Sequence, residues 1–400
     1  MVGLGSPVFP QSSGDKESIV NARQRDASRK KRDKERSGLT MPQAAQLSEA
    51  YYYPTDTMTW GKGFSEGFAK ITVKGKAGFI DLTGKVVIAP RFRDAGQFSA
   101  GLAPFQANNG KWGFIDKSGT ITITPKFDWA FPFCEDRALV QVGERWGYIA
   151  TSGKLVIPAT YEQADSFSEG FAAVSFYDKE YIWPSRSRPN GKWRSLFIDK
   201  DGKVGIDVAF DGIDRGFDCG MAIVSRNLDH SKGVISQTYV IDRTGKDLWV
   251  LDSWYVSHFS ENSIVIATGK GDHGRDVYSY LGRDGKRLMN RSFDYLAELS
   301  EGVAAARLGH NEGFIDRSGE FVIPPKFDNV ASFSEGLAGA ASGKWGFIDK
   351  TGEWVIQPQF DWVGGFSEGA ALVASGERTG TSEKTGYIDR TGQYIWTPTK

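Results

Sequence analysis

The sequence of 400 residues lacks several features by which protein classes are recognised. Its two cysteines, Cys134 and Cys219, stand far apart, which argues against a disulfide framework and a cysteine-based zinc site. No stretch approaches the ~18 apolar residues of a membrane span, and no basic N-terminal region precedes an apolar run, so we expect a cytoplasmic protein. The 49 basic and 49 acidic residues cancel, so no net charge draws the whole chain to nucleic acid or to an acidic membrane.

Signatures of catalysis are also missing. The sequence contains no Gly-x-x-x-x-Gly-Lys phosphate loop, no Gly-x-Ser-x-Gly elbow and no His-Glu-x-x-His zinc motif. Its many glycines recur at repeat spacing, so an isolated Gly-x-Gly match has no meaning for nucleotide binding. We therefore expect a protein that is not an enzyme and that needs no cofactor and no metal.

The first 48 residues differ in composition from the rest. The segment 15–36 carries nine basic and five acidic residues and almost no aromatic ones. Such a segment buries too little apolar surface to fold alone, so we expect residues 1–48 to form a disordered or partly helical charged arm. The basic run 29–32 is compatible with a localisation or nucleic-acid tag, but a solvated arm is the simpler interpretation.

Residues 49–400 are expected to form one domain of nine repeats. A Phe-Ser-Glu-Gly-like tetrad recurs at residues 64–67, 98–101, 133–136, 167–170, 217–220, 259–262, 299–302, 333–336 and 366–369. A Gly-Phe-Ile-Asp-x-x-Gly segment recurs in the same phase and ends on a glycine at 84, 119, 153, 202, 245, 285, 319, 352 and 392. Two motifs that keep one phase throughout indicate tandem units of about 34–50 residues.

The second motif resembles the WG-repeat (KWG) family. The best matches are KWGFIDKSG at 111–119 and KWGFIDKTG at 344–352, followed by RWGYIATSG at 145–153. The resemblance covers roughly residues 58–400 and weakens at 196–199 and 280–282, where the Trp-Gly pair is absent. Membership would imply a β-rich, bacterial-type repeat module and brings no catalytic residues with it.

Each unit is expected to form a three-stranded meander followed by a fourth extended piece. In the eighth unit, glycines at 343 and 352 supply positive φ for tight turns, and Pro358 ends the third strand because it has no amide to donate. Alternation places Trp345 and Phe347 on one face of the strand and Ile348 on the other. A lone meander cannot bury both faces, so neighbouring units must stack.

Two all-β architectures satisfy this stacking. We expect nine tandem meander repeats in an open twisted solenoid, which needs no closure, because nine units exceed the roughly four to eight blades usual for a propeller. A closed, propeller-like ring is the alternative. In its favour, residues 58–64 match the register of residues 360–366, so the N-terminus could complete the final unit.

Carboxylates that recur in repeat register are expected to have structural roles. We expect each tetrad glutamate to accept amide hydrogens of its own turn, beside its glycine; these residues are Glu66, Glu135, Glu169, Glu261, Glu301, Glu335 and Glu368. The aspartates before the turn glycines are typical of Asx-type turns; they are Asp81, Asp116, Asp199, Asp242, Asp316, Asp349 and Asp389. By the same argument Trp112, Trp146 and Trp345 are interpreted as core or interface residues.

Departures from the repeat give the candidate binding residues. Four units have a lengthened connection between their first and second predicted strands, at 177–194, 226–237, 268–277 and 375–385. Loops on a rigid scaffold commonly carry binding residues, so we select Trp183, Arg186, Arg188, Asp229, His230, His273, Arg275, His310 and Arg378 as candidate partner-binding residues. His258, in contrast, lies within the repeat register and is interpreted as structural.

Three functions remain open. The favoured hypothesis is a non-catalytic scaffold that binds a protein partner through the inserted loops on one side. The alternative is a glycan-binding module that uses Trp183 and neighbouring arginines. An enzyme ranks last: it would need a site among the loops, such as a metal held by Asp229, His230, Asp272 and His273, whose spacing matches no defined ligand signature.

Overall fold

The computed structural model describes residues 63–179, 192–206, 210–228, 235–253, 255–271, 274–375 and 384–397. The chain divides into a unit Met1–Met58 and a compact unit Thr59–Lys400, and every described residue belongs to the second. The predicted arm 1–48 therefore lies outside the described residues. In these ranges the regular structure is β-strand, and no helix has the length and hydropathy needed to cross a membrane.

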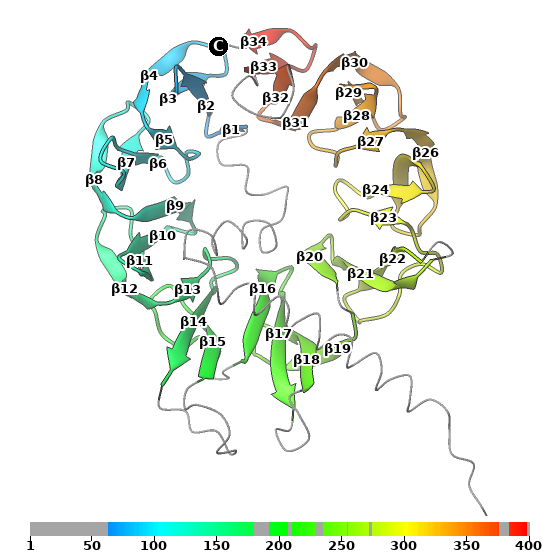
Figure 1. The fold of residues 1–400 in the computed structure, drawn as a ribbon, viewed down its shortest axis with the longest axis horizontal. Helices are drawn as coiled ribbons and strands as arrows, with labels where there is room; N and C mark the ends of the chain where they lie inside the picture. Colours follow the sequence, from blue (N-terminus) through cyan, green and yellow to red (C-terminus); the bar gives the residue numbers. More distant parts are fainter. Residues whose placement is uncertain are drawn as a thin grey trace, which may run out of the picture. The chain divides into compact units, whose positions relative to one another are not determined.

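Nine small antiparallel sheets stand around a common centre as the blades of a β-propeller (Figure 1). In each sheet the strands follow one another in sequence, with the first strand nearest the centre and the last at the outer rim. We number the sheets blade 1 to blade 9 along the chain.

The strands have the following bounds. Blades 1 to 3 contain β1 (Phe64–Ser65), β2 (Phe68–Val73), β3 (Lys76–Asp81) and β4 (Val86–Phe92); β5 (Asp94–Ala95), β6 (Leu102–Gln106), β7 (Trp112–Asp116) and β8 (Ile121–Phe127); and β9 (Trp129–Cys134), β10 (Arg137–Val142), β11 (Arg145–Ile149) and β12 (Leu155–Tyr161). Blades 4 to 6 contain β13 (Gln163–Ala164), β14 (Ala172–Asp178) and β15 (Lys192–Ile198); β16 (Gly212–Asp218), β17 (Met221–Leu228), β18 (Ile235–Asp242) and β19 (Asp247–Leu251); and β20 (Val256–Ser260), β21 (Ser263–Lys270) and β22 (Asp276–Gly282). Blades 7 to 9 contain β23 (Tyr295–Leu296), β24 (Val303–Leu308), β25 (Asn311–Asp316) and β26 (Phe321–Phe327); β27 (Asn329–Val330), β28 (Ala338–Ser342), β29 (Lys344–Ile348) and β30 (Trp354–Phe360); and β31 (Trp362–Ser367), β32 (Ala370–Ser375), β33 (Lys384–Asp389) and β34 (Tyr394–Trp396).

The unit boundaries differ from the predicted ones. The extended piece that was expected to end each unit is the innermost strand of the next blade, as β31 shows by pairing with β32. In blades 4 and 6 the fourth position is held by isolated bridges, such as Ser195 with Phe210 and Tyr278 with Phe293.

The tetrad is the hairpin between the first and second strands. Its seven glutamates have φ between 47° and 55°, and the residue after each also has positive φ, a glycine in five cases, as at Gly67 (84°), and Asp136 or Asn262 in the other two. A side chain in this region costs on the order of 1 kcal/mol, so the glutamate needs a compensating contact. That contact is on the following blade, where the Gly101 amide donates to Oε2 of Glu66 at 3.0 Å.

The same inter-blade bond is made by every tetrad glutamate. The prediction that these carboxylates accept turn amides is therefore confirmed, but the prediction that the amide belongs to their own turn is wrong. Tetrad serines add a second link, because the hydroxyl of Ser300 donates to the Phe333 carbonyl of the next blade at 2.8 Å. The tetrad thus joins blades rather than finishing a single unit.

The predicted Asx turns are confirmed. Oδ1 of Asp349 accepts the amides of Thr351 at 2.8 Å and of Glu353 at 3.2 Å. A hydrogen bond from the Thr351 hydroxyl lowers the pKa of Asp349, since it favours the charged carboxylate. Corresponding bonds occur at Asp81, Asp116, Asp199, Asp242, Asp316 and Asp389.

The core consists of layers between blades. Phe347 and Ile348 are both fully buried although they point to opposite faces of β29. Phe347 packs with Phe366 and Val373 of blade 9, whereas Ile348 packs in the cluster that contains Phe314 of blade 7. Each sheet therefore buries both faces, which is the stacking that the alternation predicted. Trp112 is buried, and Trp146 and Trp345 are half-buried.

The predicted open solenoid is wrong: blade 9 packs against blade 1 and closes the ring (Figure 1). The Ser367 hydroxyl donates to the Phe64 carbonyl at 2.8 Å, and the Gly67 amide donates to Oε2 of Glu368 at 2.8 Å. The same two bonds join blades 1, 6, 7 and 8 to the blades that follow them. Phe64 also packs edge-on against Tyr387 at 5.2 Å between ring centroids. The last tetrad thus finds its partners in the first, which an open solenoid would leave unpaired.

The glycine of the Trp-Gly pair is explained by the outer strand. In blade 8, Trp345 pairs with Phe360 and Phe347 with Ile356, so three outer residues bulge past Gly346 alone. A Cβ on Gly346 would lie 2.4 Å from the Ile356 carbonyl oxygen. Gly78, Gly113, Gly147 and Gly313 are crossed in the same way. Only glycine admits this close approach of two backbones.

Candidate functional site

Most residues selected from the sequence lie outside the described ranges; these are Trp183, Arg186, Arg188, Asp229, His230, His273 and Arg378. Arg275 and His310 are described and exposed, and no hydrogen bond or ion pair joins them. Asp272 also lies outside, so the structure describes none of the four residues of the metal hypothesis. Among the described residues, no three His, Cys, Asp or Glu side chains converge as ligands of a metal ion.

The structure places a different set of residues together, on the inner strands that surround the centre of the ring. The two residues before each tetrad lie on or beside the innermost strand. In blades 1, 2, 3, 8 and 9 the described residues there are uncharged, for example Ser332 in blade 8. In blades 4 to 7 one of the two is ionisable. We call these four residues the inner-wall cluster: Asp165, Arg215, His258 and Glu298.

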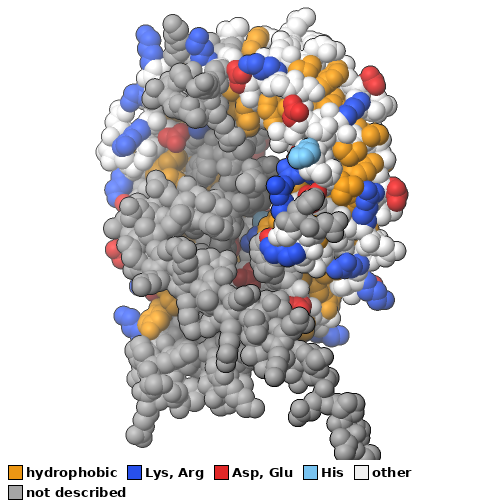
Figure 2. Space-filling view, turned by 45° about the vertical axis from the view of Figure 1, so that its right-hand side comes forward, with side chains coloured by type: hydrophobic (Ala, Val, Ile, Leu, Met, Phe, Trp, Pro, Cys, Tyr) orange, Lys and Arg blue, Asp and Glu red, His pale blue; other side chains and the backbone are white. Residues whose placement is uncertain are grey.

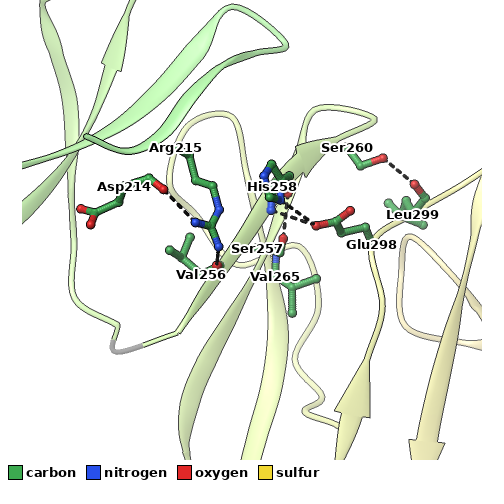
Figure 3. Close-up of polar contacts among 9 residues, drawn as sticks. All are labelled: Asp214, Arg215, Val256, Ser257, His258, Ser260, Val265, Glu298 and Leu299. Carbon is green, nitrogen blue, oxygen red and sulfur yellow. Dashed lines mark hydrogen bonds and ion pairs between the residues drawn. The ribbon is translucent and has the colours of Figure 1, made fainter. Parts of the chain in front are cut away.

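Arg215 joins blade 5 to blade 6. The chain runs one residue longer from Phe210 to Phe217 than from Phe127 to Phe133, and the β16–β17 register shifts on both sides of Arg215. Such a bulge redirects a side chain. The guanidinium donates from NH1 to the Asp214 carbonyl at 2.7 Å and from NH2 to the Val256 carbonyl at 3.3 Å (Figure 3). Its Nε is buried and has no hydrogen-bond partner in the described part of the chain.

His258 joins blade 6 to blade 7. Its amide donates to Oε1 of Glu298 at 2.8 Å, and its Nδ1 lies 3.7 Å from the same oxygen (Figure 3). Ser257 fixes the strand beside it, because its hydroxyl donates to the His258 carbonyl at 2.7 Å and accepts the Val265 amide at 3.0 Å. His258 thus makes the structural contact expected from its register, yet 28% of its side chain remains exposed.

The cluster separates the protonation behaviour of its two acids. Burial raises the pKa of Asp165 to about 6, although the positive charges of Arg215 and His258 oppose the rise. Burial also raises the pKa of Glu298, but hydrogen bonds from His258 and Ser257 and the charge of His258 outweigh it and leave the pKa lowered. The Asp165 carboxyl makes no hydrogen bond or ion pair in the described ranges. Glu298 is therefore held by bonds within the fold, whereas the Asp165 carboxyl accepts none from the described residues.

Sequence reasoning did not select this cluster, because it looked for departures in loop length. The sequence signal for this cluster is the identity of the two residues before each tetrad, not the length of a loop. Superposing the nine units on their tetrads shows Asp165, Arg215, His258 and Glu298 in four successive units where small or uncharged residues stand in most others. Lys62 of the first unit also occupies this position, and it lies outside the described residues.

The face shown in Figure 2 carries charged side chains of both signs. Figure 2 turns the right-hand blades of Figure 1 forward, and there lysine, arginine, aspartate and glutamate side chains are interspersed with apolar ones. Many of those acids and bases belong to paired structural contacts, such as Lys350 with Glu301 at 3.2 Å. Among the described inner-strand residues that precede the tetrads, those of blades 4 to 7 are the ones in which charge departs from the repeat.

Comparison of the sequence with protein families agrees with the repeat analysis. The model for the WG-containing repeat matches residues 78–112, 112–146, 146–179, 197–227, 313–342 and 345–377. The chain belongs to the WG-repeat family. The six matches leave 228–312 uncovered, which includes blade 6 and the His258 side of the inner-wall cluster. Asp165 and Arg215 lie within matched repeats, whereas His258 and Glu298 lie in the unmatched stretch.

Solved structures support the fold. A crystal structure titled as the eukaryotic initiation factor is similar with a TM-score of 0.56 at 12% identity, over 81% of this chain and 94% of that chain. BamB from Moraxella catarrhalis has a TM-score of 0.36 at 11% identity, covering 78% and 92%. The WD40 β-propeller domain of Doa1 has 0.27 at 13%, covering 79% and 94%. Only the first score supports a shared arrangement, and at such identity it concerns the fold alone. No curated protein matches the sequence.

Proposed function

We propose that this WG-repeat propeller is a non-catalytic scaffold that recognises a protein partner on the side of blades 4 to 7. The observation that carries the proposal is the inner-wall cluster, in which four successive blades place an ionisable side chain where most others have a small or uncharged residue. Three of the four lengthened connections, 177–194, 226–237 and 268–277, belong to blades 4 to 6 of the same sector. Two kinds of departure therefore coincide on one part of a ring that is otherwise repetitive.

The bonding pattern favours recognition over catalysis. Arg215 and Glu298 are held by main-chain groups of neighbouring blades, which fixes their positions without a substrate. Preorganised polar groups of this kind lower the ordering cost of binding. The Asp165 carboxyl accepts no hydrogen bond from the described residues, so a donor group of a partner would find an acceptor there. A partner segment that reaches the inner wall would be recognised by these groups, with the inserted loops contributing further contacts.

The test compares capture of partner proteins by matched variants. Full-length protein would be cross-linked in extract of its source cells, as wild type, as D165N/H258A and as Q97A/S332A, which alters the residues directly before the tetrads of blades 2 and 8. We expect one set of proteins to be recovered with wild type and Q97A/S332A and reduced at least tenfold with D165N/H258A. Thermal unfolding of all three proteins controls for folding. Equal recovery by a folded D165N/H258A protein would contradict the proposal.

A further inference from the structure

The residue directly before the innermost strand is an acid in most blades. In blades 3, 4, 5, 7, 8 and 9 these residues are Asp128, Glu162, Asp211, Asp294, Asp328 and Asp361. The corresponding residue of blade 2 is Arg93, whose amide donates to the Gln106 carbonyl as the Asp128 amide donates to that of Gln141. Blade 2 therefore reverses the charge at a position that is acidic in six other blades.

The acid has a structural role at the junctions where it occurs. It pairs with a base in the hairpin between the second and third strands of the preceding blade: Lys111 with Asp128 at 2.6 Å, Arg145 with Glu162, and Lys344 with Asp361. Oδ2 of Asp128 and Oδ2 of Asp328 each accept the amide of a hairpin glycine of their own blade at 2.8 Å. The acid thus neutralises one hairpin and fixes the next.

At the junction of blades 1 and 2 the corresponding base has no acid to pair with. This base is Lys76, which lies five residues before Asp81, as Lys111 lies five residues before Asp116. Arg93 stands where the acid would be, so a second positive charge replaces the counter-charge. Like charges repel, and a departure that works against the fold in this way is expected at functional sites.

Both cations reach the hairpin between β6 and β7 of blade 2. Nζ of Lys76 donates to Oδ1 of Asn108 at 2.8 Å. NH1 of Arg93 lies beside Gly110, because a Cβ on that glycine would be 3.7 Å from it. Lys74, in the turn of the blade 1 hairpin, is exposed, and within the described ranges neither its side chain nor that of Arg93 forms a hydrogen bond or an ion pair. Three positive charges therefore lie on the hairpins of two neighbouring blades (Figure 1), and no acid of the described chain is paired with them.

We infer that this patch, formed by Lys74, Lys76 and Arg93, binds a phosphorylated segment of a partner protein. A phosphoryl group on a side chain carries a charge of about −1.5 to −2 at neutral pH and three acceptor oxygens. Arginine and lysine bind such a group through charge-assisted hydrogen bonds. The patch lies on blades 1 and 2, so it is separate from the inner-wall cluster of the proposed function.

The extent of the unpaired charge favours one compact anion over a long one. The next bases of the two blades, Lys70 and Lys111, are already neutralised, by Asp94 at 3.1 Å and by Asp128 at 2.6 Å. The uncompensated charge is thus limited to three residues, whereas a protein that follows a nucleic-acid backbone commonly contacts on the order of 6–10 phosphates. The turns 73–76 and 106–111 also contain no aromatic residue on which a base could stack, a contact that single-stranded nucleic acids commonly use.

The probe is a pool of immobilised peptides with one central phosphoserine and randomised neighbours. The same pool with serine and the same pool with glutamate at the central position are the controls. In phosphate-free buffer, full-length wild-type protein should bind the phosphoserine pool at least tenfold more tightly than either control pool. Inorganic phosphate, tested in parallel, should bind at least tenfold more weakly than the phosphoserine pool.

Protein variants locate the site and control for net charge. R93D introduces the acid of the other blades, which should pair with Lys76 and preserve the fold, and it should weaken phosphoserine binding at least tenfold. K85E makes the same change in net charge at the opposite end of β3, with the residue type that blades 7 and 8 have there, and it should leave binding unchanged. K76N introduces the residue type of blade 7 at that position and should weaken binding at least threefold while Arg93 stays in place.

Thermal unfolding of each variant verifies that it is folded. The inference would be overturned by absence of phosphoserine-dependent binding in wild type, by equal affinity for the glutamate pool or for inorganic phosphate, or by equal losses in R93D and K85E. A single-stranded RNA of mixed sequence that binds wild type more tightly than the phosphoserine pool does, and that R93D no longer binds, would overturn it in favour of a nucleic-acid site.

Discussion

Blade 8 and blade 5 contain corresponding strands, and they use them differently. In blade 8, Ser334 and Glu335 both bond to blade 9, and Gly346 admits a bulged outer strand. In blade 5 the corresponding residues are Asp218, Cys219 and Tyr239. Each of the three replaces a residue that in blade 8 either bonds to the next blade or admits the bulged outer strand.

The replacements in blade 5 are coupled to new contacts. Arg215 donates to the Val256 carbonyl across the junction where Cys219 has replaced the tetrad glutamate. Tyr239 stacks under the Arg226 guanidinium, at 4.9 Å from the ring centroid, where blade 8 has a bare backbone. Blade 5 has thus lost some contacts of the regular repeat and gained others. Residues that no longer make the regular contacts can take part in binding instead.

The largest contrast concerns the glycine under the bulge. In G346A the added methyl group meets the Ile356 carbonyl at 2.4 Å, so we expect a loss of about 3 kcal/mol in the free energy of unfolding. G216A of blade 5 is the matched control, because nothing lies within 4 Å of its Cβ, and it should change stability by less than about 0.5 kcal/mol. Denaturant titration of both variants checks this. Equal effects would show that the bulge does not constrain the Trp-Gly pair.

The second contrast is between an acid with a raised pKa and one with a lowered pKa. The Asp165 pKa is about 6 in the folded chain and about 3.8 when unfolded, so the folded state binds the proton more tightly. Stability is therefore lost as pH rises from about 4 to about 6 and stays lower above it. D165N removes this loss and should be more stable than wild type by about 2 kcal/mol at pH 8, with the difference vanishing near pH 4. Thermal melts at several pH values measure it.

The third contrast compares the closing junction with an internal one. E368A and E301A each remove a carboxylate that accepts a tetrad amide of the next blade. Each should cost about 1 kcal/mol of unfolding free energy, measured by denaturant titration. If E301A is destabilising and E368A is neutral, the ring is open between blades 9 and 1 in solution.

The smallest expected effect belongs to Glu298. E298Q keeps one acceptor for the His258 amide but removes the charge that His258 favours, so we expect a loss of about 0.5–1 kcal/mol at pH 7. Because the folded pKa of Glu298 is lowered, this contribution is present at neutral pH and is lost as pH falls through that pKa. Melts at pH 7 and pH 4 should show the difference between E298Q and wild type shrinking. A constant difference would mean that the charge plays no part.

Local features of the fold were predictable because they depend on neighbouring residues. The repeat phase, the Asx turns at positions such as Asp349 and the opposite facing of Phe347 and Ile348 all follow from sequence spacing. The closed ring did not follow, since closure depends on a small angle between blades summed over nine junctions. The complementary groups at Ser367 and Phe64 were visible, but their meeting is a long-range event.

The candidate site was missed for a related reason. Loop length drew attention to residues such as Trp183 and His230, which lie outside the described ranges, so that selection stays a prediction. Arg215 and His258 sit in strands of nearly constant length, and their significance appears only when units are compared position by position and then placed side by side. Three of the four lengthened connections nevertheless belong to blades 4 to 6, which also carry three residues of the inner-wall cluster.

The strands of each described blade are consecutive in sequence, and the junction between the last and the first blade is made by the same two bonds as the regular junctions, such as that of blades 7 and 8. A polypeptide circularly permuted to start at blade 5 and finish at blade 4 would therefore meet the same contacts in the same order. Duplication or loss of one unit would change the tilt shared by all junctions without removing any particular bond. In a ring of nearly equivalent blades a binding partner could dock in several equivalent orientations. The irregular blades remove this equivalence and so define one orientation.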